Sequence, residues 1–287
     1  MPAKNTLDYL ERVLDPVAKR TRGRHSILLL NPSLAQYRDT IAGLYRHLEY
    51  DPPTEILTAI PQRDVLNYTC IKPTAESAAA IGPVEIYTIC QDNYTNLRLL
   101  NPLRTCSADI TVVVFIDIER NRLMETVNGH NYIERSDQNS LAVFKETCIR
   151  PILEETTTIL NDTSLKFKSC IVCVTNASLL LYNSLTTSPV DYIQQFLRTK
   201  LLHHTTETGT FDYLVYFRNS ISTTPTTPTQ STTSHPQSLF FNLLCGQQID
   251  DSFNIQESSL HPDIFICAAK DSSSRIALLA EWGENRE

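Results

Sequence analysis

The chain has 287 residues, and its apolar share of 41% is enough to bury the core of one large domain or two small ones. Its net charge of −7 and isoelectric point near 5.5 provide no positive field for nucleic acid or anionic lipid, and no block rich in lysine and arginine occurs. We therefore expect no nucleic-acid binding. No run of about 18 apolar residues occurs in the chain, so we also expect no membrane insertion and no secretion.

The first segment predicts an amphipathic helix over residues 7–20. Apolar residues recur there at helical spacing: Leu7, Leu10, Val13, Leu14 and Val17. A basic cluster follows: Lys19, Arg20, Arg22 and Arg24. We therefore separate an N-terminal helix and basic segment, residues 1–24, from a domain over 25–287. The apolar stripe either binds a partner or packs back onto that domain.

A phosphate-binding loop without its phosphate chemistry comes next. Residues 25–30 read as a buried strand, and residues 31–38 lead into a helix-like run through Leu44. A P-loop at this place needs glycines for backbone approach, a lysine for the β/γ-phosphates and a hydroxyl for Mg²⁺. Other residues stand in those positions: Asn31 and Gln36 for the glycines, Tyr37 for the lysine and Arg38 for the hydroxyl. The scaffold is kept, and the groups that bind phosphate are missing.

Apolar, β-branched runs alternate with helix-like segments along the rest of the chain. The strand-like runs are Val84–Cys90, Ile110–Asp117, Cys170–Thr175, Tyr213–Phe217 and Ile264–Cys267. The helix-like segments are Leu123–Arg135, Ser140–Leu160, Val190–Leu202, Leu239–Cys245 and Arg275–Trp282. This alternation predicts an α/β fold of the Ras-like, P-loop type, with a mostly parallel sheet covered by helices on both faces.

Asp117 is the residue that we first suspect of chemistry. It ends an almost continuously apolar strand, and ligands of open α/β sheets bind at that end of the strands. No histidine, serine or second carboxylate can be placed beside it from the sequence. The competing interpretation is a helix N-cap or a loop hydrogen bond.

The cysteine and histidine patterns indicate no metal site. The one CxxC, Cys170 to Cys173, falls in a predicted strand, where side chains three apart point to opposite faces, and no second CxxC accompanies it. The adjacent pair His203-His204 lies on a predicted helix end, where neighbours do not share a face. We predict no metal, no cofactor, no catalytic residue and no enzymatic activity.

A low-complexity stretch interrupts the domain at about residues 220–238. Its Ser, Thr, Pro and Gln residues cannot bury enough apolar surface to fold, so we expect a disordered surface loop. Thr224 and Thr227 each precede a proline and are candidate phosphorylation sites.

In order and spacing, residues 7–282 resemble the dynein light intermediate chain family. That family begins with a helix, a basic stretch and a P-loop strand, as this chain does. Further segments are similar in the same order: Leu48-Glu49-Tyr50, Ile86–Asp92, Leu99-Leu100, Asp117–Glu125, Ile171–Asn176, Asp191–Arg198, and the closing Ile264-Phe265, Asp271 and Arg275-Ile276.

The chain departs from this family where nucleotide would bind and at its C-terminus. Thr175-Asn176-Ala177-Ser178 replaces the base-reading TKxD motif and has neither the lysine nor the aspartate. With the P-loop groups also missing, we expect no nucleotide and no hydrolysis. The chain stops soon after Trp282, so we expect the family's long adaptor-binding arm to be absent or very short.

The resemblance implies a non-catalytic pseudo-GTPase subunit of cytoplasmic dynein, a microtubule motor. Its partners would be the heavy-chain tail and other dynein subunits. The N-terminal helix and the 239–282 region would hold the tail, with these candidate anchors: Leu10, Val13, Leu14, Leu278 and Leu279. Two other functions stay open, a pseudo-GTPase scaffold of a kinetochore or vesicle-trafficking complex, and a divergent P-loop-like hydrolase that uses Asp117.

Overall fold

A computed structural model describes residues 25–62, 65–72, 82–90, 97–104, 110–118, 145–162, 165–177, 193–200, 212–217, 221, 236–247, 249, 263–268, 271–272, 274 and 276. Several predicted features lie outside these residues. They are the N-terminal helix and basic segment at 1–24, the helix at 123–135, the histidine pair at 203–204, most of the low-complexity loop with both threonines, and Leu278 and Leu279. The division of the chain at residue 24 therefore stays a prediction.

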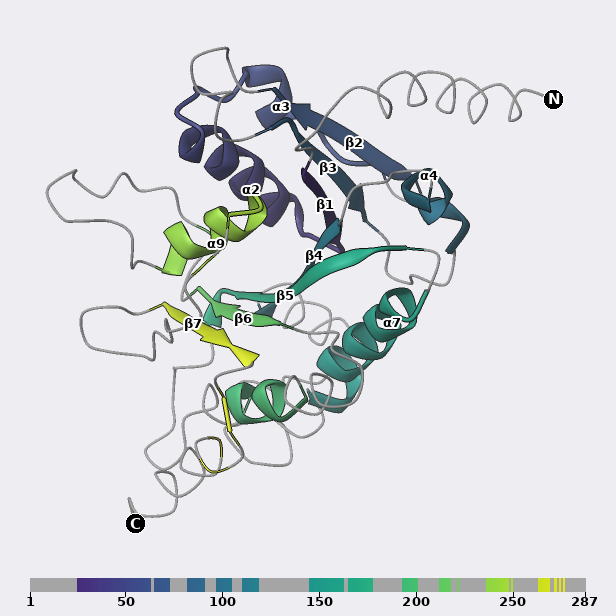
Figure 1. Ribbon diagram of the computed structural model, residues 1–287, viewed down its shortest axis with the longest axis vertical. Coiled ribbons are helices and arrows are strands. Elements are labelled where there is room, and N and C mark those ends of the chain that lie inside the picture. Colours follow the sequence, from purple (N-terminus) through teal and green to yellow (C-terminus); the bar gives the residue numbers. More distant parts are fainter. Residues whose placement is uncertain are drawn as a thin grey trace, which may run out of the picture.

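A seven-stranded sheet forms the centre of the molecule (Figure 1), in the order β2-β3-β1-β4-β5-β6-β7. Its strands are β1 (His25–Leu30), β2 (Leu66–Ile71), β3 (Val84–Ile89), β4 (Ile110–Asp117), β5 (Phe167–Thr175), β6 (Tyr213–Tyr216) and β7 (Ile264–Cys267). The five inner strands run parallel, and β2 and β7 pair antiparallel at the two edges. This arrangement confirms the predicted α/β fold with a mostly parallel sheet.

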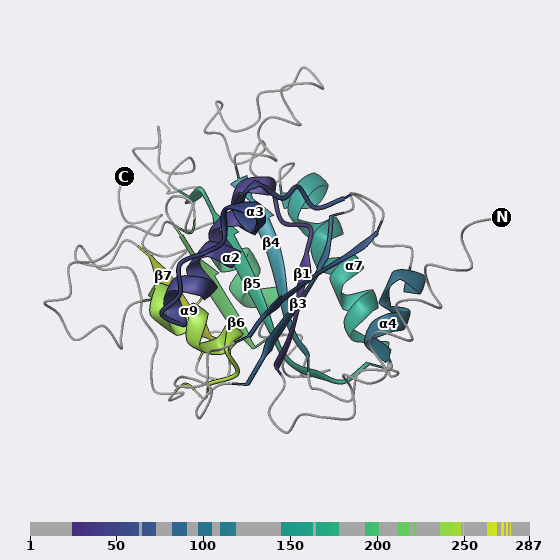
Figure 2. The ribbon, with the colours of Figure 1, turned by 90° about the horizontal axis from the view of Figure 1, so that it is seen from above.

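Helices cover both faces of this sheet. The helices labelled in Figure 1 are α2 (Leu34–His47), α3 (Thr54–Thr58), α4 (Asn101–Arg104), α7 (Arg150–Leu160) and α9 (Pro236–Leu244). Residues 193–200 form a further helix, a 3₁₀ turn (Leu97–Leu100) precedes α4, and a π-helical turn (Lys145–Ile149) leads into α7. Figures 1 and 2 show α2 and α9 together on one face and α7 and α4 on the other.

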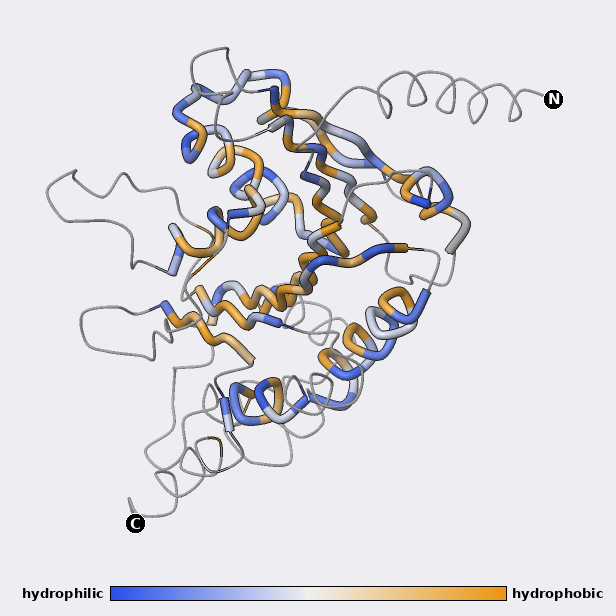
Figure 3. The backbone as a smooth tube through the Cα atoms, in the orientation of Figure 1, coloured by the Kyte–Doolittle hydropathy of each residue, from blue (hydrophilic) through white to orange (hydrophobic). Residues whose placement is uncertain are grey.

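The alternation of side chains along each strand creates two cores. In β1, Ile27 and Leu29 join the core under α2 and α9, whereas Leu28 and Leu30 join the core under α7. In Figure 3 the central strands are accordingly orange over most of their length, while the helices carry both colours. A sheet that is buried on both faces needs apolar residues at consecutive positions, and β1 and β4 provide them.

The structure also differs from the prediction at particular elements. The edge strand β2 and the short helix α3 were not predicted. Strand β5 begins at Phe167 rather than at Cys170, and α9 begins at Pro236 rather than at Leu239. The earlier start of β5 has a packing reason, because the half-buried Phe167 packs against the core under α7.

Candidate functional site at the carboxyl ends of the parallel strands

The carboxyl ends of β1, β4 and β5 bring the suspected residues to one edge of the sheet. In the register of the sheet Leu30 pairs with Val114, and Asp117 pairs with Thr175. Asn31 and Asn176 follow their strands with φ angles of 50° and 57°, in the left-handed region that asparagine tolerates better than most residues. The two asparagines thus turn the chain out of the sheet where a nucleotide-binding domain would hold its ligand.

The connection between β1 and α2 is too short to surround a phosphate. Only Asn31, Pro32 and Ser33 separate the strand from the helix, whereas the P-loop motif has five positions ahead of its second glycine. The helix begins at Leu34, so the residues aligned with the second glycine, the lysine and the hydroxyl are all helical. The sequence-based alignment placed residues 31–38 ahead of the helical run, and the structure corrects this boundary.

Helix α2 begins with a capping box made by Ser33 and Gln36. The backbone N–H of Gln36 donates to Ser33 Oγ at 3.3 Å, and the backbone N–H of Ser33 donates to Gln36 Oε1 at 2.7 Å. Unpaired N–H groups in the first turn are what makes a helix N-terminus a phosphate site. Here two such donors are already occupied by the chain's own side chains.

The side chain of Gln36 also ties this helix to β5. Its Nε2 donates to the hydroxyl of Thr175 at 2.6 Å, and both residues are buried. Tyr37, at the lysine position, is also buried, and its hydroxyl lies 3.3 Å from the hydroxyl of Thr69 on β2. Arg38, the third aligned residue, is half-buried on α2. Gln36, Tyr37 and Arg38, which stand in P-loop positions, therefore serve as packing residues of α2.

Asp117 makes a loop hydrogen bond. Its Oδ1 accepts from Nδ2 of Asn176 at 3.0 Å, and Asn176 occupies the lysine position of the lost TKxD motif. Of the two interpretations of Asp117, this contact fits the loop hydrogen-bonding role. The bond joins the ends of β4 and β5 at the turn of Asn176.

The neighbouring cysteines are poor nucleophiles. Cys170 and Cys173 point into opposite cores, as predicted from their spacing. Burial raises the pKa of both thiols well above the usual value, and the charges of Asp212 near Cys170 and of Asp117 near Cys173 raise it further. Thiols that stay protonated behave as small apolar groups.

The described residues contain no grouping typical of a metal site and no helix that could span a membrane. No group of three or more His, Cys, Asp or Glu side chains there is arranged to hold a metal ion. Within the same part of the chain, every helix is too short or too polar to cross a bilayer.

Comparisons with known proteins give a distant similarity in structure. No protein-family model matches the sequence, and no curated protein matches it significantly. The fold is similar to the crystal structure of the conserved domain of the dynein light intermediate chain, with 15% identity and a TM-score of 0.49 over 90% of this chain and 86% of that one. This is a distant structural relationship, and it carries no information on activity or partners.

Proposed function

We propose that this chain is a non-catalytic light intermediate chain of cytoplasmic dynein. It binds the heavy-chain tail and stabilises the motor complex for transport along microtubules in the cytoplasm. The order of similar segments along the sequence supports the dynein assignment. The capping box of Ser33 and Gln36, at the place of the P-loop, carries the non-catalytic part of the proposal.

The capping box works against nucleotide binding in two ways. An incoming phosphate would have to displace Ser33 and Gln36 from the backbone donors of α2 and separate Gln36 from Thr175. No lysine stands in the P-loop to compensate with positive charge, because Tyr37 occupies that position. A domain of this kind acts through its surface, by binding another protein.

The ion pair between Arg198 and Asp271 agrees with this assignment. The segments Asp191–Arg198 and Ile264–Ile276 were matched to the family separately, and they are far apart in the sequence. The two side chains nevertheless meet inside the protein. The pair thereby attaches Asp271, within the 239–282 region, to the helix at 193–200, and a region that binds a large partner needs such attachments.

Mass spectrometry of copurifying proteins tests the proposal. The tagged chain is recovered from its native cells at moderate salt, and dynein heavy and intermediate chains in near-equal amount are expected. Recovery of a kinetochore or vesicle-trafficking complex without dynein subunits would contradict the dynein assignment and keep the non-catalytic one. Nucleotide bound stoichiometrically to the purified protein would contradict the non-catalytic assignment.

A further inference from the structure

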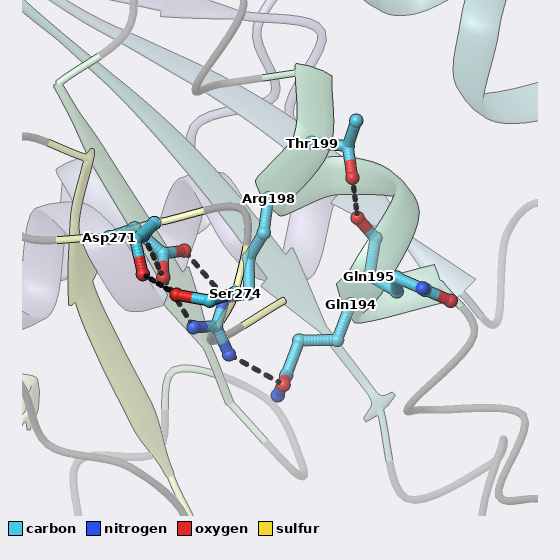
Figure 4. Close-up of polar contacts among 7 residues, drawn as sticks. Gln194, Gln195, Arg198, Thr199, Asp271 and Ser274 are labelled. Atoms are coloured by element: carbon cyan, nitrogen blue, oxygen red, sulfur yellow. Dashed lines mark hydrogen bonds and ion pairs between the residues drawn. The ribbon is translucent and has the colours of Figure 1, made fainter. Parts of the chain in front are cut away.

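Arg198 and Asp271 form a bidentate ion pair inside the protein (Figure 4). Arg198 Nε lies 2.6 Å from Asp271 Oδ2, and Arg198 Nη2 lies 2.5 Å from Asp271 Oδ1. The two side chains are 4% and 3% exposed. Arg198 belongs to the helix at 193–200, whereas Asp271 follows the last strand, β7. The pair thus joins two segments that are 73 positions apart.

Both charged groups are oriented by further hydrogen bonds. Nη1 of Arg198 donates to Oε1 of Gln194, one turn earlier in the same helix, at 3.4 Å (Figure 4). Oδ1 of Asp271 also accepts from the backbone N–H of Ser272 at 3.0 Å. The backbone N–H of Asp271 donates to the carbonyl of Ala268 at 3.1 Å. The direction of the pair is therefore fixed from the helix and from the chain after β7.

The structure describes four residues of the segment that follows β7. They are Asp271, Ser272, Ser274 and Ile276, and we call them the closing turn. Within this turn, the backbone N–H of Ile276 donates to the carbonyl of Ser272 at 3.0 Å. The side chain of Ile276 is buried. Strand β7 itself has four residues and stands at the edge of the sheet, paired with β6. Short edge elements of this kind open before the central strands do.

A buried ion pair is better suited to fixing geometry than to adding stability. The desolvation of two charges offsets most of their attraction, and well-packed apolar residues of similar size often replace such a pair at no loss of stability. A bidentate arginine–carboxylate contact does, however, add geometric specificity through its two parallel hydrogen bonds. An apolar contact in the same place has no such directional bonds to hold the closing turn.

We propose that Arg198 and Asp271 are positioning residues that fix the closing turn against the helix at 193–200. If the proposed function holds, the pair also sets the geometry in which the 239–282 region meets the heavy-chain tail. The turn is released locally when the pair is broken, and the sheet stays folded.

Hydrogen exchange of the full chain tests the positioning role directly. In Asp271→Asn, the amide of Ile276, whose acceptor is the carbonyl of Ser272, is expected to exchange about tenfold faster or more, while the amides of β5 keep their protection. The double variant Arg198→Met with Asp271→Leu is expected to keep the melting temperature and still show the faster exchange of Ile276. Arg104→Met, which removes the more exposed Arg104–Asp162 pair, is the matched control and should leave the Ile276 amide unchanged.

Two results would overturn the positioning role. One is wild-type exchange at Ile276 in both variants. The other is a loss of protection that spreads equally over β5 in the double variant, because the pair would then be an element of global stability. If Asp271→Asn alone fails to fold, the double variant decides, since it leaves no unpaired buried charge.

Heavy-chain capture from cell extract tests the consequence for binding. Wild type and Arg104→Met should capture equal amounts, and the double variant should capture less at an unchanged melting temperature. Equal capture by the double variant would overturn the role of the pair in heavy-chain binding. If wild type captures no heavy chain, the proposed function fails, and the exchange experiment still decides whether the pair positions the closing turn.

Discussion

The side-chain amide of Gln36 donates a buried hydrogen bond of 2.6 Å to the hydroxyl of Thr175, which joins the start of α2 to the end of β5. The oxygen of the same amide accepts from the backbone N–H of Ser33. One side chain therefore completes the helix cap and connects it to the sheet. It does so from the place where the P-loop motif has its second glycine, whose lack of a side chain lets phosphate approach.

Gln36→Ala should lower the free energy of unfolding by about 1–3 kcal/mol, because the buried hydroxyl of Thr175 loses its donor and α2 loses half of its capping box. Urea unfolding measures the change. Gln195→Ala is the matched control, since this half-buried glutamine also lies on a helix and should change stability by less than about 0.5 kcal/mol. Equal effects of the two substitutions would mean that the Gln36–Thr175 bond contributes nothing specific.

Mg²⁺ with GTP or ATP should leave the melting temperature of the purified chain unchanged. A ligand present at 100 times its dissociation constant stabilises a folded protein by about 2.7 kcal/mol, which a thermal scan detects readily. Asp117→Asn is expected to change neither this result nor the absence of nucleotide hydrolysis. A nucleotide-dependent rise in melting temperature that Asp117→Asn removes would favour the hydrolase hypothesis instead.

The inner strands could be predicted from the sequence because they are buried on both faces. Strand β4 reads as an almost continuously apolar run, and its observed bounds are those predicted. The edge strand β2 gives no such signal, since residues such as Asn67, Tyr68 and Thr69 are half-buried or exposed. A strand that pairs on one side and faces solvent on the other resembles a loop in composition.

The candidate site was predictable in part. The pattern Ser33-Leu34-Ala35-Gln36 is a capping-box signature. It predicts the observed start of α2, whereas the P-loop spacing does not. The bonds of Gln36 to Thr175 and of Arg198 to Asp271 had no such signal. They join residues 139 and 73 positions apart, and only the packing of helices on the sheet brings them together.

Gly43→Ala should destabilise the protein although alanine favours helices. An added Cβ would lie 2.0 Å from Cζ of Phe241, where α9 crosses α2. Overpacking of this kind costs about 1–3 kcal/mol. The gain in helix propensity from glycine to alanine is about 1 kcal/mol at most, so the net effect is a loss. Thermal unfolding measures it. In a Phe241→Leu background the same substitution should cost less, and an equal cost would exclude the contact as the cause.

Deletion of residues 1–22 should abolish or strongly reduce heavy-chain capture, if the predicted N-terminal helix binds the tail as the proposed function holds. The apolar stripe with Leu10, Val13 and Leu14 would provide the contact. Leu10→Glu with Leu14→Glu tests the same surface without shortening the chain, and Asp8→Lys on the polar side is its control. Unchanged capture by the deletion variant would refute the role of this helix.

Protonation of His47 should destabilise the fold. Its ring stacks on Phe241 at 6.0 Å between centroids, and burial lowers its pKa below the ordinary 6.5, with the hydrogen bond to Asn242 offsetting part of the effect. The unfolded chain therefore binds a proton more readily than the folded one. Stability contributed by neutral His47 is fully present above pH 6.5 and is lost as the pH falls through the lower pKa of the folded state.

Urea unfolding of wild type and His47→Gln at about pH 7.5 and about pH 5.5 isolates this contribution from the other titrating groups. Wild type should lose more stability than the variant between the two conditions. An acidic carboxyl such as Asp212, whose pKa burial raises, titrates in both proteins and cancels in the comparison. Equal losses would mean that the imidazole is as easily protonated in the folded protein as in the unfolded chain, and that the stack on Phe241 does not select the neutral ring.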